Sequence, residues 1–327
     1  MKAKSAIKLL IPFLVLLLAT PIIGVGCQEA ERQPPTESAR SELSSTLVPN
    51  TPLDLYIYSR QDSPTRIPAE MVDASSDINV DSLAVWGVPV ADDFAFGMGI
   101  TLTNASDASG LYGEITMEED GWKRLSGNTV YLVYGSGAAA ESLKAAISNN
   151  DFKPYDDNEC LKAVATLPSG GETKLAVIAL TKPSTALIGF MTQDADPEAL
   201  GMIDMILKLV NLKVIAAGLY SPRQIDIAEI AEVMENDGRI TDLDLGALVL
   251  VKSGLPGFLL KPALEKFLEE AEFTETILDG LTLYRGTWDI GEGDSILVLV
   301  RIEGNYVFAA VSGQESYAET LITSIKK

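Results

Sequence analysis

Apolar and polar positions follow two periods along this chain, and each period predicts one kind of secondary structure. Between 258 and 269 the apolar residues are spaced three and four apart, as on one face of an amphipathic helix. Residues 197–209 show the same spacing and are also expected to form a helix. Residues 297–300 are an unbroken aliphatic run followed by turn residues, which predicts a strand. The chain therefore mixes helices with strands.

The order of these elements repeats along the chain. Asp237-Gly238 lies 117 positions after Asp120-Gly121, and Ser253-Gly254 lies 117 positions after Ser136-Gly137. Both times an apolar strand precedes the Ser-Gly pair, and a helix, further strands and a closing helix follow it. We therefore predict an α+β fold of two sequence-related, ferredoxin-like units with helices on one face of a largely antiparallel sheet. The alternative is chance punctuation of an ordinary α/β chain.

The N-terminus has the pattern of an export signal. Lys2, Lys4 and Lys8 make the first residues positive, and an apolar run of 11 residues follows at 9–19. A helix needs about 20 apolar residues to span a bilayer, so this run is short for a membrane anchor. Small residues then lead to Cys27.

The stretch Gly24-Val25-Gly26-Cys27 resembles the lipobox of bacterial lipoproteins, although Gly24 stands where that family usually has leucine. The resemblance implies that the Cys27 thiol receives a diacylglyceryl group and that Cys27 becomes the new N-terminus. Two or more acyl chains, such as palmitate, hold a protein stably at a membrane. An ordinary cleaved signal and an uncleaved anchor over 7–25 are the alternatives.

The stretch after the cysteine is polar. Residues 28–52 contain four prolines and almost no apolar periodicity, which is typical of a chain that cannot fold alone. The predicted organisation is a signal peptide at 1–26, a disordered tether at 27–52, an N-terminal extension packing on the first unit at 53–93, and two α/β repeats at 94–211 and 212–327.

The chain is strongly acidic. Its formal net charge of −21 becomes −24 when the three lysines of the signal are removed. Nucleic-acid binding relies on Lys and Arg that neutralise phosphates, so we expect no nucleic-acid partner. We expect contact with the membrane through the lipid anchor, together with a protein or small-molecule partner that the sequence does not identify. No cofactor is expected.

The absence of histidine limits the chemistry that this chain can perform. Ser-His-Asp catalysis, Cys-His catalysis and His-ligated zinc all require that residue. If Cys27 carries lipid, Cys160 remains as a single thiol, and its apolar neighbours predict a buried position on a strand over 160–164. An enzyme would have to use carboxylates or a hard metal held by oxygen.

One loop carries enough acid to suggest such a metal. Asp289, Glu292 and Asp294 fall in a predicted hairpin loop with Gly291 and Gly293 between them. Glycine permits positive φ, so the three carboxylates could converge on a cation. A solvated acidic loop is the alternative interpretation.

Four other patterns have both a functional and a structural interpretation. Residues 135–140 fit the dinucleotide fingerprint but also a tight strand-to-helix turn. Residues 235–244 partly match a calcium loop but lack its first acid, and favour an ordinary turn. The acids at 73, 77 and 81 indicate an acidic loop, and three scattered tryptophans favour core positions over a sugar platform. The residues concerned are Asp73, Asp77, Asp81, Trp86, Trp122 and Trp288.

These features together predict a lipid-anchored protein on the extracytoplasmic side of the cell membrane. The favoured function is a non-enzymatic binding or scaffolding module. The alternatives are the substrate-binding lipoprotein of a transporter and, third, a carboxylate-based enzyme.

Overall fold

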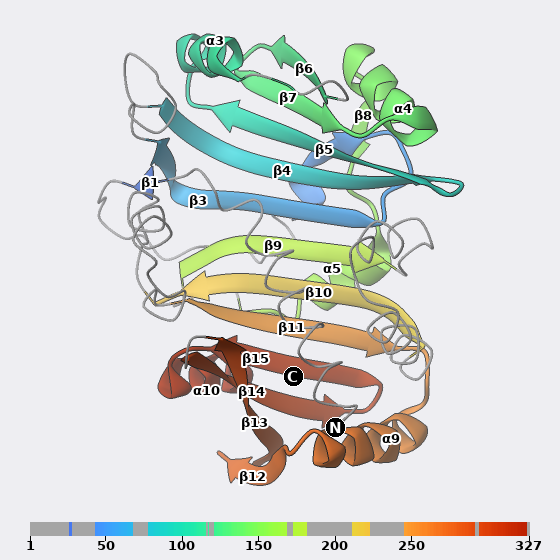
Figure 1. Cartoon of the computed structure of the whole chain (residues 1–327), viewed down its shortest axis with the longest axis vertical. Coiled ribbons are helices and arrows are strands. Elements are labelled where there is room, and N and C mark those ends of the chain that lie inside the picture. Colours follow the sequence, from blue (N-terminus) through green and yellow to red (C-terminus); the bar gives the residue numbers. More distant parts are fainter. Residues whose placement is uncertain are drawn as a thin grey trace.

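The computed structural model describes residues 26–27, 43–67, 78–115, 117, 121–168, 173–181, 211–222, 245–291 and 294–325. They form a mixed α/β fold dominated by one large antiparallel sheet (Figure 1). The described helices are α3 (Ala105–Glu114), α4 (Gly137–Ser148), α5 (Asn158–Val164), α9 (Gly257–Glu270) and α10 (Glu315–Thr323). The strands are β1 (Gly26–Cys27), β2 (Leu47–Pro49), β3 (Leu55–Ile67), β4 (Ile78–Val90), β5 (Asp93–Leu102), β6 (Gly121–Ser126), β7 (Thr129–Tyr134), β8 (Phe152–Pro154), β9 (Thr173–Thr181), β10 (Leu212–Ser221), β11 (Gly246–Ser253), β12 (Thr274–Leu278), β13 (Leu281–Gly291), β14 (Asp294–Glu303) and β15 (Tyr306–Ser312).

Two elements predicted from local apolar patterns are present in the structure. The helix expected over 258–269 is α9, and the strand expected over 297–300 lies within β14. The helix expected over 197–209 lies outside the described residues.

The main sheet runs without a break through both halves of the chain, in the order β12-β13-β14-β15-β11-β10-β9-β3-β4-β5-β7-β6, with β1 beside β3. β9 joins the halves, because Val177 pairs with Tyr58 of β3 on one side and with Gly218 of β10 on the other. The structure does not confirm the predicted ferredoxin-like duplication. Two separate units would each close their own sheet, whereas here the halves share hydrogen bonds along β9 and β10.

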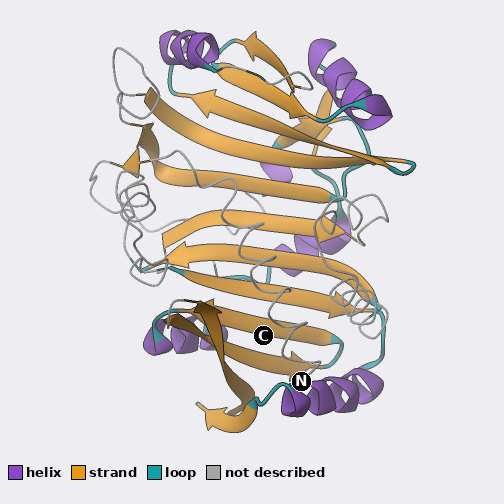
Figure 2. Cartoon of the chain, viewed as in Figure 1, coloured by secondary structure: helices purple, strands orange, loops and turns teal. Residues whose placement is uncertain are grey.

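Helices cover both faces of the sheet, which corrects the prediction of one helical face. Leu297 and Leu299 of β14 pack in the same core cluster as α10, while Val298 and Val300 pack with Leu268 of α9. Successive strand residues point to opposite faces, so α9 and α10 lie on opposite sides. We call the side of α4, α5 and α10 the α5 face, and the side of α3 and α9 the α3–α9 face. Figure 2 shows the helices around the strands in one view.

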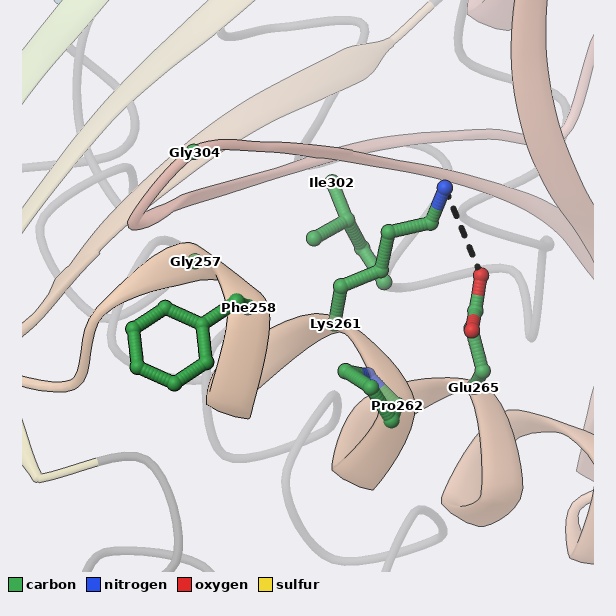
Figure 3. Close-up of a pocket in the computed structure, with 7 residues that line it drawn as sticks. All are labelled: Gly257, Phe258, Lys261, Pro262, Glu265, Ile302 and Gly304. Atoms are coloured by element: carbon green, nitrogen blue, oxygen red, sulfur yellow. Dashed lines mark ion pairs between the residues drawn. The ribbon is translucent and has the colours of Figure 1, made fainter.

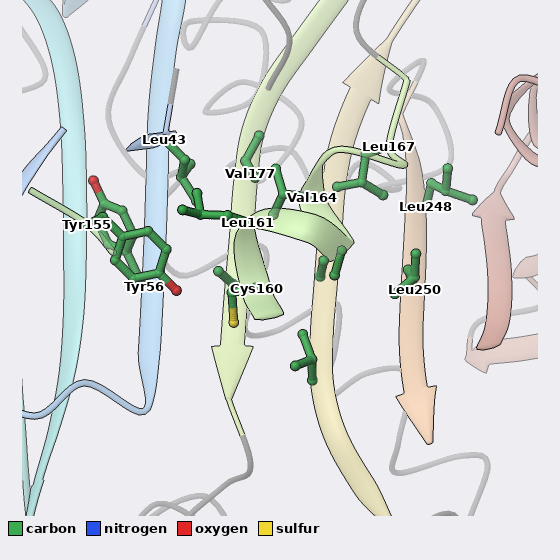
Figure 4. Close-up of a cluster of buried hydrophobic side chains, with 14 of the residues drawn as sticks. Leu43, Tyr56, Tyr155, Cys160, Leu161, Val164, Leu167, Val177, Leu248 and Leu250 are labelled. Atoms are coloured by element: carbon green, nitrogen blue, oxygen red, sulfur yellow. The ribbon is translucent and has the colours of Figure 1, made fainter. Parts of the chain in front are cut away.

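The centre of the α5 face corrects the prediction of a strand over 160–164. These residues belong to α5, whose N-terminus is capped by Asp157: its carboxylate accepts hydrogen bonds from the backbone N–H groups of Glu159 (3.0 Å) and Cys160 (2.9 Å). This capping overrides the β-like run that follows. α5 packs on β9 and β10 and brings Cys160 into the core (Figure 4).

Residues 43–54, which precede β3, are described and include buried side chains. Leu43 is fully buried and Val48 is 1 % exposed, and β2 pairs with β8 in a small second sheet. This differs from the expected disorder through residue 52. Burial of a few apolar side chains is enough to hold this polar stretch against the core of the folded body. Such isolated apolar residues leave no periodic pattern in the sequence.

No described helix is both long enough and apolar enough to cross a bilayer.

Candidate functional site

The predicted lipid-attachment residue lies beside a long strand. Cys27 is in β1, and its backbone pairs with Thr65 of β3. Its acylation stays a prediction.

The predicted metal site is described only in part. Asp289 and Asp294 lie in β13 and β14, which form the expected antiparallel hairpin, with Asp289 opposite Ser295 and Gly291 opposite Asp294. Glu292 lies outside the described residues, and so the site stays a prediction. Within the described ranges, no three Asp, Glu or Cys residues are grouped so that they could hold a metal.

The glycines at 135 and 137 form a tight turn rather than a phosphate loop. A carboxylate oxygen of Asp93 accepts a hydrogen bond from the N–H of Ala139 (2.9 Å) in the first turn of α4. A Cβ atom at Gly137, where φ is +82°, would lie 2.5 Å from that oxygen. The helix N-terminus that would bind a phosphate is therefore taken by an acid of the chain itself.

Trp86 is part of the core, as the structural interpretation of the tryptophans predicted. Its ring is 2 % exposed and lies over β5, where a Cβ atom on Gly99 would stand 2.8 Å from it. Trp122 is partly buried against the same cluster. The side chain of Trp288 is not described, and neither are Asp73, Asp77 and 235–244. Asp81 lies 3.7 Å from Arg60 in an ion pair.

The Cys160 thiol is a structural group. It is fully buried, and burial raises its pKa to about 12. A thiolate is the nucleophilic and metal-binding form, so this residue stays inert near neutral pH. Tyr155 beside it also has a raised pKa, mainly because of burial.

Two exposed carboxylates have a pKa that is shifted downward. The pKa of Glu159 is lowered by its hydrogen bond with Lys252, and that of Glu315 by its hydrogen bond with Arg285. A catalytic general acid needs the opposite shift, caused by an apolar or acidic environment. These residues are therefore ion-pair partners that tie elements together: Lys252 belongs to β11 and Glu159 to α5.

An open groove of about 560 Å³ lies beside the first turns of α9 (Figure 3). Its polar side chains are Lys261 and Glu265, which are 3.6 Å apart, and Glu265 also accepts a hydrogen bond from the Tyr284 hydroxyl. Phe258 at its rim is 76 % exposed. Since its two charges already neutralise each other, the groove offers little that would orient a small ligand.

The middle of the α3–α9 face carries a cluster of buried apolar side chains drawn from strands alone. It connects the two halves, since β3, β4 and β5 contribute to it together with β9, β10 and β11. Its buried members are Leu55, Ile57, Leu83, Val85, Phe94, Ile178, Leu180, Ala217, Leu219, Ala247 and Val249.

The two ends of the sheet are edge strands, β6 and β12. In β12, Ile277 is 74 % exposed, which makes it one of the most exposed apolar side chains of the described structure. The Asp279-Gly280 turn joins β12 to β13, with φ values of +50° and +77°. Sequence reasoning missed this edge, although Asp-Gly between two apolar runs is a strong hairpin signal.

The chain matches no protein-family model and no curated protein sequence. Among solved structures it is similar to crystal forms I and III of TP0453, with 11 % and 10 % sequence identity and TM-scores of 0.36 and 0.35. The alignments cover 86 % and 85 % of this chain and 99 % and 96 % of those chains. We draw no functional conclusion from likeness at this level.

Proposed function

We propose that the protein is a lipid-anchored, extracytoplasmic binding or scaffolding module without enzymatic activity. The lipobox-like cysteine supports the anchor, and the acidic charge of the chain supports a body that stands away from anionic lipid. The observation that carries the proposal is the continuous sheet, which makes both halves one platform ending in two edges.

The described polar groups support the same view. The Asp93 and Asp157 carboxylates cap helices, and the Cys160 thiol is buried. Glu159 and Glu315 form ion pairs with a lysine and an arginine of the chain. Each of these groups has a structural partner or position that accounts for it. A catalytic group would instead combine a shifted pKa with access to a substrate.

The continuous sheet weighs against the transporter alternative. Closure around a substrate requires two lobes that rotate about a hinge. Here a rotation between the halves would have to break the β9–β10 ladder, which runs from the pair Val214–Thr181 to the pair Ser221–Thr173. A surface-binding role makes no such demand.

The test is metabolic labelling with a radioactive or clickable palmitate in a bacterial host. The wild-type chain is expected to incorporate label and to partition with membranes. Cys27→Ala should lose both the label and the membrane association, while Cys160→Ala should keep both. An unlabelled wild-type chain that is released as a soluble protein would contradict the anchor.

Binding is tested by cross-linking on intact cells that express the anchored protein. A defined partner enriched by the wild-type chain, and not by the lipid anchor fused to an unrelated domain, is the expected result. Turnover of a substrate by the purified chain would contradict the non-enzymatic role.

A further inference from the structure

We propose that the outer edge of β12 docks a basic, extended segment of a partner protein, which joins the sheet as an additional strand. This inference rests on the proposed role as a binding module and names the class of its partner.

The turn determines which backbone groups face outward. Positive φ at both Asp279 and Gly280 is the signature of a type I′ turn, and Leu278 pairs with Leu281 across it. The residues flanking such a turn exchange both hydrogen bonds, and bonded and non-bonded pairs then alternate along the ladder. Ile277 and Glu275 therefore direct their N–H and C=O groups away from β13. Within the described residues no strand pairs with β12 on that side.

The side chains of β12 suit an added strand. Ile277 and Glu275 lie two positions apart and so share one face, and both are exposed. Ile277 offers an apolar contact, and the threonine-rich, β-branched sequence of β12 favours an extended backbone. In strand addition the main chain supplies affinity and alternate side chains supply specificity.

The charges around the edge select the partner. Five acids and no Lys or Arg occur between 267 and 281, and all five acids are exposed; one of them, Glu270, lies 4.0 Å from Lys266 in an ion pair. A segment with Lys or Arg at alternate positions would be attracted, whereas a second copy of this chain, with its net charge of −21, would be repelled. The acids are Glu269, Glu270, Glu272, Glu275 and Asp279.

The experiment measures fluorescence anisotropy of a labelled peptide of alternating lysine and valine, added to the purified full chain in detergent. Wild type is expected to bind it. Ile277→Pro removes an outward N–H and leaves the bonds to β13, so it should weaken binding about tenfold, as expected for the loss of one backbone hydrogen bond. Ile277→Thr keeps the backbone and serves as the matched control, with a smaller loss. Circular dichroism checks that both variants fold.

Three results would overturn the proposal. One is equal binding by the Ile277→Pro and Ile277→Thr variants, which would mean that the backbone edge is not used. Another is equal affinity for a glutamate–valine peptide, which would remove the charge selection. The third is a wild-type dimer that Ile277→Pro dissociates, which would assign the edge to a second copy. A cellular partner cross-linked equally by wild type and Ile277→Pro would leave the proposed function standing while this inference fails.

Discussion

The two edge strands of the sheet, β6 and β12, both lie in hairpins with a two-residue turn but differ in the charges of their side chains. β6 and β12 are each joined to the next strand by a two-residue turn, Gly127-Asn128 in one case and Asp279-Gly280 in the other. At β6, Lys123 Nζ donates to the carbonyls of Tyr112 (2.7 Å) and Ile115 (2.6 Å) at the end of α3. Its neighbour Arg124 donates to the Ile147 carbonyl at the end of α4.

Lys123 and Arg124 therefore perform two tasks. Adjacent strand residues point to opposite faces, so one cation reaches α3 and the other reaches α4, and each satisfies carbonyls at a helix C-terminus. The same charges discourage another strand from pairing with β6. β12 contains no cation, and exposes Ile277 instead. The β6 edge is protected by its own cations, whereas the β12 edge has no such charge and is accessible to another strand.

The largest expected effect comes from removing the Lys123 hydrogen bonds at the β6 edge. Lys123→Met keeps the aliphatic stem and removes two charge-assisted hydrogen bonds, so we expect the free energy of unfolding to fall by about 1–3 kcal/mol. Urea denaturation measures it. The control is Lys266→Met, whose side chain is 78 % exposed, and it should change stability by less than about 0.5 kcal/mol. Equal effects would mean that the Lys123 bonds contribute nothing.

The second test compares the two turns. Gly280→Ala and Gly127→Ala both place a side chain at positive φ (+77° and +61°) and should each cost about 1 kcal/mol. Hydrogen exchange should separate them. Asn128 Nδ2 donates to the Leu102 carbonyl (2.6 Å), so loosening at Gly127 should spread into β5, whereas loosening at Gly280 should stay within β12 and β13. The same spread for both would contradict the comparison.

The third test concerns association more than stability. Ile277→Lys places a guarding charge on the open edge, and because the side chain is 74 % exposed, stability should change by less than about 0.5 kcal/mol. Fluorescence anisotropy should show weaker association with the lysine–valine peptide, because the added cation repels the basic peptide. Leu259→Lys, at a 52 % exposed position on α9, is the control and should leave association at the wild-type level.

The smallest effect is a pH dependence confined to the β12 end. Arg285 of β13 lowers the pKa of Glu315 at the start of α10, so this pair contributes stability above the ordinary carboxyl pKa. That contribution is lost as the pH falls through the lowered value. The β6 contacts join the Lys123 and Arg124 side chains to backbone carbonyls and involve no carboxylate. Lowering the pH from 6.5 to 3.5 should therefore loosen α10 and β13 more than β6, which hydrogen exchange measures at both pH values. Glu315→Gln should remove this difference between the elements.

Individual elements could be predicted from the sequence because their signals are local. The apolar period of α9 and the aliphatic run of β14 each appear within about ten residues. Strand neighbours are not local in this sense. Nothing in the sequence of β9 states that Val177 will pair with both Tyr58 and Gly218, so the repeat of element order did not predict that one sheet joins the two halves. α5 was misread because the cap at Asp157 outweighed the apolar run that it precedes.

The candidate sites also divide into those with a local sequence signal and those that depend on strand order. The core position of Trp86 was the interpretation that the sequence favoured, and the tight turn was one of the two interpretations that it offered for the glycines near α4. The open edge was missed, because an edge is defined by the absence of a neighbour, which only the strand order reveals. The Asp279-Gly280 pair would have identified its hairpin but not its position at the end of the sheet.

The placement of β9 between the halves also makes them complementary fragments. A chain divided between 181 and 212 would yield two pieces, one with β9 and the other with β10, whose edges pair along the ladder except for one register shift between Leu219 and Tyr220. The Lys252–Glu159 ion pair and the hydrogen bond from the Tyr220 hydroxyl to the Pro168 carbonyl (3.4 Å) would form again across the join. Fused to two halves of a reporter, the fragments should reassemble, as in a split-protein sensor.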